Sequence, residues 1–153
     1  MSEVIVFGGI NMDLFAYVPR STQEGETIEA DAIEFYLGGK GANQAVALSR
    51  LGVKVRFVAT IGSDQFGNQL ENLIKKENII TSNMNRKEGK SGIALINVLK
   101  DGRNEVISFP SVNKKTLSQQ VSDENLQDCS ILIGQMEVEP LQTTDLFIRA
   151  KNN

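Results

Sequence analysis

The chain has 153 residues, of which 41% are hydrophobic and 23% charged, and its formal net charge is −3. These values are ordinary for one globular domain and give no net positive charge that would indicate a nucleic-acid partner. The sequence contains no histidine and a single cysteine, Cys129, which excludes imidazole catalysis, intrachain disulfides and cysteine-based zinc sites.

Further expectations follow from the apolar segments. We expect Cys129 to be a small hydrophobe buried in the core. No apolar run approaches the ~20 residues of a membrane span. The N-terminus begins directly with a strand-like run and lacks the layout of a signal peptide. We therefore expect a cytoplasmic protein without a membrane partner.

The first third of the chain predicts a strand, an extended segment and a helix. Residues 4–7 (VIVF) form a short apolar run, typical of a strand buried on both faces. Residues 14–37 mix β-forming residues with turn signals and lack helical spacing, which indicates extended structure outside the main sheet. Residues 41–51 follow as a helix that Gly52 ends.

The rest of the chain alternates strands and helices. The expected strands span residues 55–61, 92–99, 105–109 and 131–133, and the expected helices span residues 64–77, 123–128 and 141–150. Ser63 or Asp64 would cap the first of these helices, and Asp101-Gly102 predicts a tight hairpin. The alternation predicts an α/β fold with a largely parallel sheet, in which ligands bind at the carboxyl ends of the strands.

A glycine-rich segment, residues 38–43 (GGKGAN), is the strongest candidate for a binding site. Bare N–H groups at the start of the following helix, together with Lys40, could hold a polyhydroxylated or anionic ligand. The alternative is a tight strand–helix connection with an exposed Lys40 and an Asn43 that only caps backbone. The segment is not a P-loop, because Gly41 follows the lysine, and it is not a dinucleotide fingerprint, because Gln44 replaces the third glycine.

Polar residues also follow other predicted strands, so these loops are expected to converge on one cleft. Asn11 and Asp13 lie just past the first strand and could bind two sugar hydroxyls, or could form an Asx turn. Glu137 could accept a hydroxyl or be a solvated acid, and Glu139 is the competing carboxylate. Residues 62–67 (GSDQFG) resemble a phosphate loop, although capping of the next helix is the simpler interpretation.

Taken together, these motifs resemble the ribokinase family of PfkB-type carbohydrate and nucleoside kinases. The resemblance rests on residues 9–13 (GINMD), 25–27 (GET), 38–46 (GGKGANQAV), 62–67 (GSDQFG), 91–96 (SGIALI) and 135–137 (QME). The order and spacing of these segments cover essentially the whole chain. Residues 111–113 (SVN) depart from the Gly-Ala-Asn that is usual at this place in the family.

The resemblance implies a three-layer α/β/α fold with a small β-sheet lid that covers the sugar and often forms a homodimer interface. Residues 14–37 and the strands near residues 92–109 would supply the lid. The residues that the resemblance implies for sugar binding are Asn11, Asp13, Gly39, Lys40, Asn43, Ala94 and Glu137. The implied reaction transfers phosphate from ATP to the terminal 5-hydroxyl of a pentose, most simply D-ribose, with Mg²⁺ and a monovalent cation such as K⁺.

Members of this family are about twice as long, and their second half carries a Gly-Ala-Gly-Asp motif whose aspartate is the general base. That motif does not occur here, so no catalytic residue and no metal ligand is assigned to this chain. Most residues that bind ATP, Mg²⁺ and K⁺ belong to the same missing half. We therefore interpret residues 1–153 as an incomplete fold, the N-terminal, sugar-binding part of a ribokinase-like kinase.

Three interpretations of this chain remain open. The sequence ends where the next strand of the family's sheet would follow, and this favours a fragment of an active kinase. The alternatives are one half of a split enzyme and a non-catalytic sugar-binding or dimerising module. Other sugars or nucleosides are alternative substrates, because lid contacts separate the members of the family.

Overall fold

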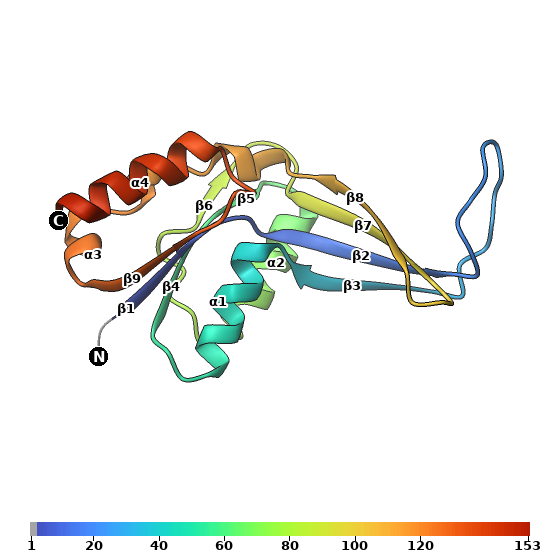
Figure 1. Ribbon diagram of the computed structural model, residues 1–153, viewed down its shortest axis with the longest axis horizontal. Helices are drawn as coiled ribbons and strands as arrows, with labels where there is room; N and C mark the ends of the chain where they lie inside the picture. The colour runs from blue at the N-terminus through green and yellow to red at the C-terminus, as the bar shows by residue number, and fades with distance from the viewer. Residues whose placement is uncertain (1–2) are drawn as a thin grey trace.

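The computed structural model describes residues 3–153 and shows a mixed α/β fold (Figure 1). In chain order the elements are β1 (Glu3–Phe7), β2 (Asn11–Val18), β3 (Ala32–Gly38), α1 (Lys40–Arg50), β4 (Val55–Val58), β5 (Thr60–Gly62), α2 (Gln65–Lys75), β6 (Asn85–Lys87), β7 (Gly92–Leu99), β8 (Asn104–Phe109), the 3₁₀ turns η1 (Ser111–Lys115) and η2 (Ser118–Gln120), α3 (Asp123–Gln127), β9 (Cys129–Gly134) and α4 (Pro140–Asn152).

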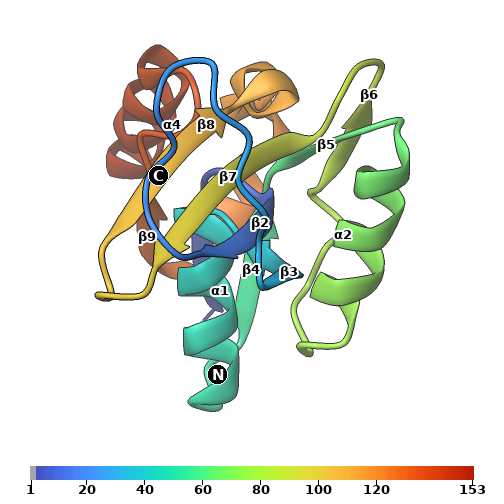
Figure 2. The ribbon, with the colours of Figure 1, turned by 90° about the vertical axis from the view of Figure 1, so that its right-hand side faces the viewer.

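The main sheet has the order β4-β1-β9, and all its strands are parallel. Side chains of a strand alternate between its two faces, so Val4 and Val6 pack against α1 and α2. Ile5 and Phe7 point the other way and pack with residues of α3 and α4. Figure 2 shows α2 and α4 on opposite sides of the molecule. The predicted three-layer α/β/α arrangement is therefore confirmed.

A second sheet, with the order β3-β2-β7-β8, extends away from these layers (Figure 1). We call it the projecting sheet. Its central strands β2 and β7 run parallel, and the two outer pairs are antiparallel. Residues 100–103 join β7 to β8, which confirms the hairpin predicted from Asp101-Gly102. Asn11 and Asp13 lie inside β2, so the expectation that they occupy a loop past the first strand, with an Asx turn as one possibility, is wrong.

Two other expectations need correction. The single strand expected over residues 55–61 is two strands in different sheets, because the Ala59 carbonyl accepts hydrogen bonds from the Gln120 side chain and the Asn85 backbone. Strand β6, which pairs with β5, has no periodic signal in the sequence. Cys129 is only half-buried, because it lies at the start of the edge strand β9.

The two edges of the main sheet differ. On the β4 side, Ile80 exchanges backbone hydrogen bonds with Phe57 and Val55 at 3.0 and 2.9 Å. On the β9 side, no strand of the described residues pairs with the outer edge, and Ile131 is 56% exposed. Beside this edge lies a groove of about 620 Å³, lined by Gly134, Met136, Thr143, Thr144, Phe147, Ile148 and Lys151. Apolar surface of this kind is typical of an interface.

None of the helices in the described part of the chain is long and apolar enough to cross a lipid bilayer.

Asp64 joins α2 to the start of β7. One carboxylate oxygen accepts from the Gly67 backbone at 2.9 Å and from the Ser91 hydroxyl at 2.6 Å. The other accepts from the Ser91 backbone at 3.1 Å, and the Ser91 hydroxyl in turn accepts from the Gly62 backbone. Residues 62–67 therefore form a helix cap, as the simpler interpretation predicts, because the carboxylate of Asp64 occupies the place that a phosphate would need.

We predict that Asp64→Ala lowers the free energy of unfolding by about 2 kcal/mol, since it removes a helix cap and leaves the Ser91 donors without an acceptor. Urea denaturation followed by circular dichroism measures the change. Asp128→Ala, at an exposed aspartate that follows α3, is the matched control and should shift stability by less than about 0.5 kcal/mol. Equal effects of the two variants would contradict this role of Asp64.

Candidate functional site

The N-terminus of α1 is pressed against the connection between β1 and β2. The Ala42 backbone donates to the Gly9 carbonyl at 3.1 Å. A Cβ atom on Gly41 would lie 2.8 Å from the carbonyl carbon of Gly8. Gly39, the N-cap residue, has φ +92°, and a Cβ there would lie 2.7 Å from the Gly9 oxygen. Only glycines allow this approach, because any side chain would overlap backbone atoms.

Glu137, from the loop after β9, closes the start of α1. Its Oε2 accepts from the Lys40 backbone at 2.6 Å, and its Oε1 accepts from the Lys40 ammonium at 2.8 Å. A Cβ on Gly9 would lie 2.9 Å from the same carboxylate, so that glycine makes room for it. The expectation of bare N–H groups at the start of α1 is therefore wrong for Lys40 and Ala42. Each oxygen of Glu137 keeps lone-pair capacity for a ligand hydroxyl.

Asp13 lies on β2 beside Tyr36 of β3 and Ala94 of β7. A Cβ on Gly38 would lie 2.0 Å from the Asp13 carboxylate, so the side chain occupies the space above that glycine. Its Oδ1 atom is buried and has no hydrogen-bond partner in the structure. Buried polar atoms are normally paired, and an unpaired acceptor in a site is typical of an atom that a ligand satisfies.

The electrostatics connect Asp13 to the residues at the start of α1. The pKa of the Asp13 carboxyl is raised to about 6, mainly by burial and also by the negative charge of Glu137, while the Lys40 ammonium opposes both effects. Asp13, Lys40 and Glu137 therefore belong to one site. A ligand hydroxyl that donates a hydrogen bond to the Asp13 carboxylate would lower the free-energy cost of keeping this carboxylate ionised.

Asn11 is held by Asn113, a residue of η1 that lies 102 positions away. The Asn113 Nδ2 donates to the Asn11 Oδ1 at 2.7 Å and to the Ile10 carbonyl at 3.1 Å. The Asn113 Oδ1 accepts from the Ile10 backbone at 3.0 Å. Sequence reasoning did not select Asn113 as a site residue, although it belongs to the segment 111–113 that departs from the family pattern. Its partners are too distant in sequence to be inferred locally.

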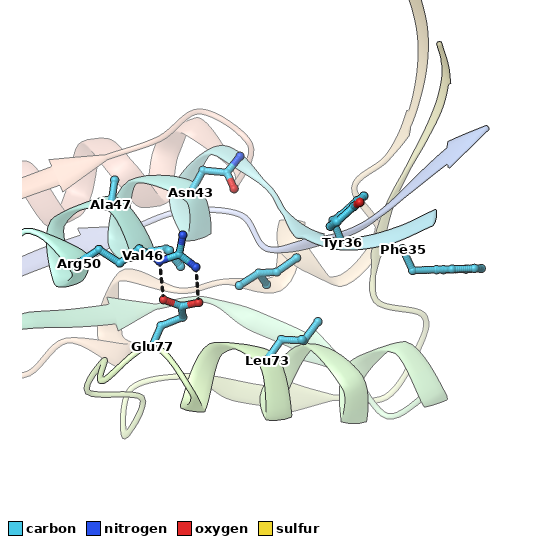
Figure 3. Close-up of a pocket in the computed structure, with 9 residues that line it drawn as sticks. Phe35, Tyr36, Asn43, Val46, Ala47, Arg50, Leu73 and Glu77 are labelled. Carbon is cyan, nitrogen blue, oxygen red and sulfur yellow. Dashed lines mark hydrogen bonds and ion pairs between the residues drawn. The ribbon is translucent and has the colours of Figure 1, made fainter. Parts of the chain in front are cut away.

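Three of the residues predicted to bind a ligand line two different pockets. Asn11 and Glu137 line a cavity of about 320 Å³, whose other lining residues are Ser108, Pro110, Asn113, Lys114, Met136, Val138, Glu139 and Pro140. Asn43 is exposed on the first turn of α1 and lines a different pocket, of about 460 Å³. Figure 3 shows Asn43 near the N-terminal end of α1 and the Arg50–Glu77 ion pair of that pocket further along the helix.

The described residues do not fit a nucleotide phosphate or a metal ion. In residues 3–153 no group of three or more His, Cys, Asp or Glu side chains could hold a metal. The N-termini of α1, α2 and α3, which are the usual kind of phosphate site, already carry carboxylates. Glu137 occupies the start of α1, Asp64 caps α2, and Asp123 and Glu124 lie in the first turn of α3. The donors and acceptors around Asn11, Asp13 and Glu137 suit a neutral polyhydroxylated ligand instead.

Comparison with known proteins agrees with this chemistry. Residues 1–133 match the model of the pfkB family carbohydrate kinases. The chain is 37% identical to ribokinase from Haemophilus influenzae, with 97% of this chain and 49% of that protein covered, and 31% identical to deoxyribokinase from Salmonella typhi, with 90% and 46% covered. The crystal structure of ribokinase from Thermotoga maritima aligns with TM-score 0.84 and 35% identity over 94% of this chain and 48% of that one. The chain thus spans about half the length of the relatives it matches.

Because the folded state raises the pKa of Asp13 from 3.8 to about 6, ionisation of this carboxyl destabilises the protein. The stabilising contribution of the protonated Asp13 carboxyl is fully present below pH 4 and is lost as the pH rises through 6. We predict that the stability of Asp13→Asn relative to the unmodified chain rises by about 2 kcal/mol between pH 4 and pH 8. Urea denaturation across this range measures the difference. A flat profile for Asp13→Asn would contradict the prediction.

Proposed function

Since the chain belongs to the pfkB family of carbohydrate kinases, we propose that it carries the sugar-binding half of an ATP-dependent kinase of the ribokinase type. The observation that carries this proposal is the buried, unpaired Oδ1 of Asp13 beside Asn11 and the Lys40–Glu137 pair. Hydroxyl groups of a sugar supply the hydrogen bonds that these side chains lack. D-ribose is the proposed substrate, and the deoxyribokinase relative makes 2-deoxyribose the second candidate.

In this proposal Asp13 accepts a hydrogen bond from one sugar hydroxyl, and Asn11 and Glu137 contact others. Gly39 and Lys40 line the site at the start of α1, and Ala94, buried beside Asp13, provides an apolar contact. Asn43 is proposed to contact the sugar from the exposed first turn of α1. The projecting sheet is proposed to act as the lid, because it carries Asp13 and Ala94 and would cover a ligand bound to them.

The proposed division of labour places the nucleotide in the part that the relatives have and this chain lacks. Phosphoryl transfer requires an oriented hydroxyl, neutralised phosphate charge and a base. The described residues can orient the hydroxyl, whereas the N-termini of α1 and α2 are occupied by carboxylates. ATP, Mg²⁺ and K⁺ are therefore proposed to be bound mainly by a second half, whether it follows in the same polypeptide or is a separate one.

The open edge of β9 is the proposed attachment place for that second half. A parallel strand could pair with the free edge, and a helix could cover the apolar groove beside Phe147 and Ile148. A different surface is proposed for a homodimer. Residues Phe35, Leu95 and Ile107 share one face of the projecting sheet and are all exposed. A second copy could bury this apolar row.

We predict that the chain binds D-ribose and that Asp13→Ala weakens binding at least about tenfold, because the sugar then loses a charged acceptor. Isothermal titration calorimetry at pH 8, where Asp13 is ionised, measures the affinity. Asp128→Ala is the matched control and should bind as the unmodified chain does. Ribose affinity that is unchanged in Asp13→Ala would contradict the assignment of this residue.

We further predict no ribose-dependent release of ADP by the chain alone, and activity when it is co-expressed with the second half of the Haemophilus influenzae relative. Phe147→Asp should abolish this reconstitution, because a charge in the groove opposes docking, while ribose affinity stays unchanged. Leu51→Asp places the same charge on a residue that is 80% exposed and distant from the groove, and it should be tolerated. Turnover by the chain alone would contradict the proposed division of labour.

A further inference from the structure

We propose that Asn113 is a positioning residue that sets the hydrogen-bonding sense of Asn11, so that the site presents a donor from Asn11 next to an acceptor from Asp13. The ligand is then a polyol in which one hydroxyl oxygen accepts from Asn11 and another hydroxyl donates to Asp13. This inference rests on the proposed sugar-binding function and specifies how hydroxyls are distinguished within it.

The backbone fixes the orientation of the Asn113 amide. The N–H of Ile10 can only donate, so the atom that faces it at 3.0 Å must be the Asn113 oxygen. The carbonyl of Ile10 can only accept, so the atom that faces it at 3.1 Å must be the Asn113 nitrogen. Turning the amide over would break both contacts. Asn113 is 1% exposed, so bulk water does not replace them.

The orientation of Asn113 then determines that of Asn11. The second N–H of the Asn113 amide points at Asn11 and donates to its Oδ1 at 2.7 Å. A reversed Asn11 would place its NH₂ group against the NH₂ group of Asn113, and two donors cannot bond to each other. The Asn11 Nδ2 has no acceptor among the described residues, and Asn11 lines the 320 Å³ cavity. Its two N–H groups are therefore available to a ligand.

Gly92 is part of this arrangement. It lies opposite Asn11 in the register of β2 and β7. A Cβ atom at Gly92 would lie 2.1 Å from the Asn11 Oδ1 and 2.3 Å from the Asn113 Nδ2. The pair of amides thus occupies the volume that any side chain at this position would fill, which explains why β7 begins with glycine.

Asp13 completes the polarity pattern. It lies two residues after Asn11 and on the same face of β2. Its ionised carboxylate can only accept, and its Oδ1 is unpaired. A donor and an acceptor therefore stand side by side on one strand. A hydroxyl can satisfy either of them, whereas a fluorine atom in its place can satisfy only the donor.

The test compares D-ribose with analogues in which a single hydroxyl is replaced by hydrogen or by fluorine, with affinities measured by titration calorimetry at pH 8. We expect one position at which the fluoro sugar binds about threefold or more tighter than the deoxy sugar, because fluorine accepts from Asn11. At the position that faces Asp13, the fluoro sugar should bind no more tightly than the deoxy sugar.

Asn113→Ala should bring the fluoro-to-deoxy affinity ratio at the first position close to one, because Asn11 is then free to turn. The ratio is independent of the folded fraction, so partial destabilisation of the variant does not change it. Ser111→Ala, in the same 3₁₀ turn, is the matched control, since the Ser111 hydroxyl donates only to the Lys90 carbonyl. It should keep the ratio of the unmodified chain.

Asn11→Asp provides a second, nearly isosteric variant that keeps the contact with Asn113 and presents an oxygen to the ligand. This variant should reverse the preference between the two analogues, so that the fluoro sugar binds more weakly than the deoxy sugar at the first position. An Asn113→Ala variant that keeps the full ratio, or an unmodified chain that prefers fluorine nowhere, overturns the inference while ribose binding itself stands. Failure of D-ribose to bind overturns the proposed function and this inference with it.

Discussion

The close contact between the first turn of α1 and the β1–β2 connection is the constraint on which the rest of the site depends. Glycines at positions 8, 9, 39 and 41 remove every side chain from this contact, so backbone packs directly on backbone. The approach brings the start of α1 within reach of Glu137, a residue from the far end of the chain. A larger residue at position 8, 39 or 41 would move the helix outward, and one at position 9 would displace the carboxylate of Glu137.

Glycine also serves a second purpose, which is to leave volume for functional side chains. Gly38 lies beneath the Asp13 carboxylate, and Gly92 lies beneath the Asn11–Asn113 pair. The side chains that fill these volumes are satisfied only in part, since Asn113 donates to Asn11 whereas Asp13 keeps an unpaired oxygen and a raised pKa. A site that is completed only by its ligand is less stable without it, which is the usual compromise between stability and function.

Local sequence predicts the local part of this structure. The alternation of strands and helices, the cap at Asp64 and the hairpin at Asp101-Gly102 follow from patterns a few residues long, and each is confirmed. The errors concern contacts between distant segments. Residues 55–61 read as one apolar strand, and the break at Ala59 depends on Gln120. Bare N–H groups were expected at the start of α1, and the carboxylate that accepts from the first of them, at Lys40, lies 97 residues away.

The same distinction bears on the ligand that the described residues could bind. Its acceptors and donors for a neutral ligand arise from contacts among β2, η1, α1 and the loop after β9, all of which lie within the described chain. Helix N-termini are common binding sites for phosphate groups, and carboxylates occupy those of α1 and α2 here. Among residues 3–153 no strand pairs with the outer edge of β9, and this edge lies directly before the loop that carries Glu137. A second half docked at that edge, as proposed, would therefore meet the proposed sugar site at its rim, where a bound hydroxyl and a phosphate could be brought together.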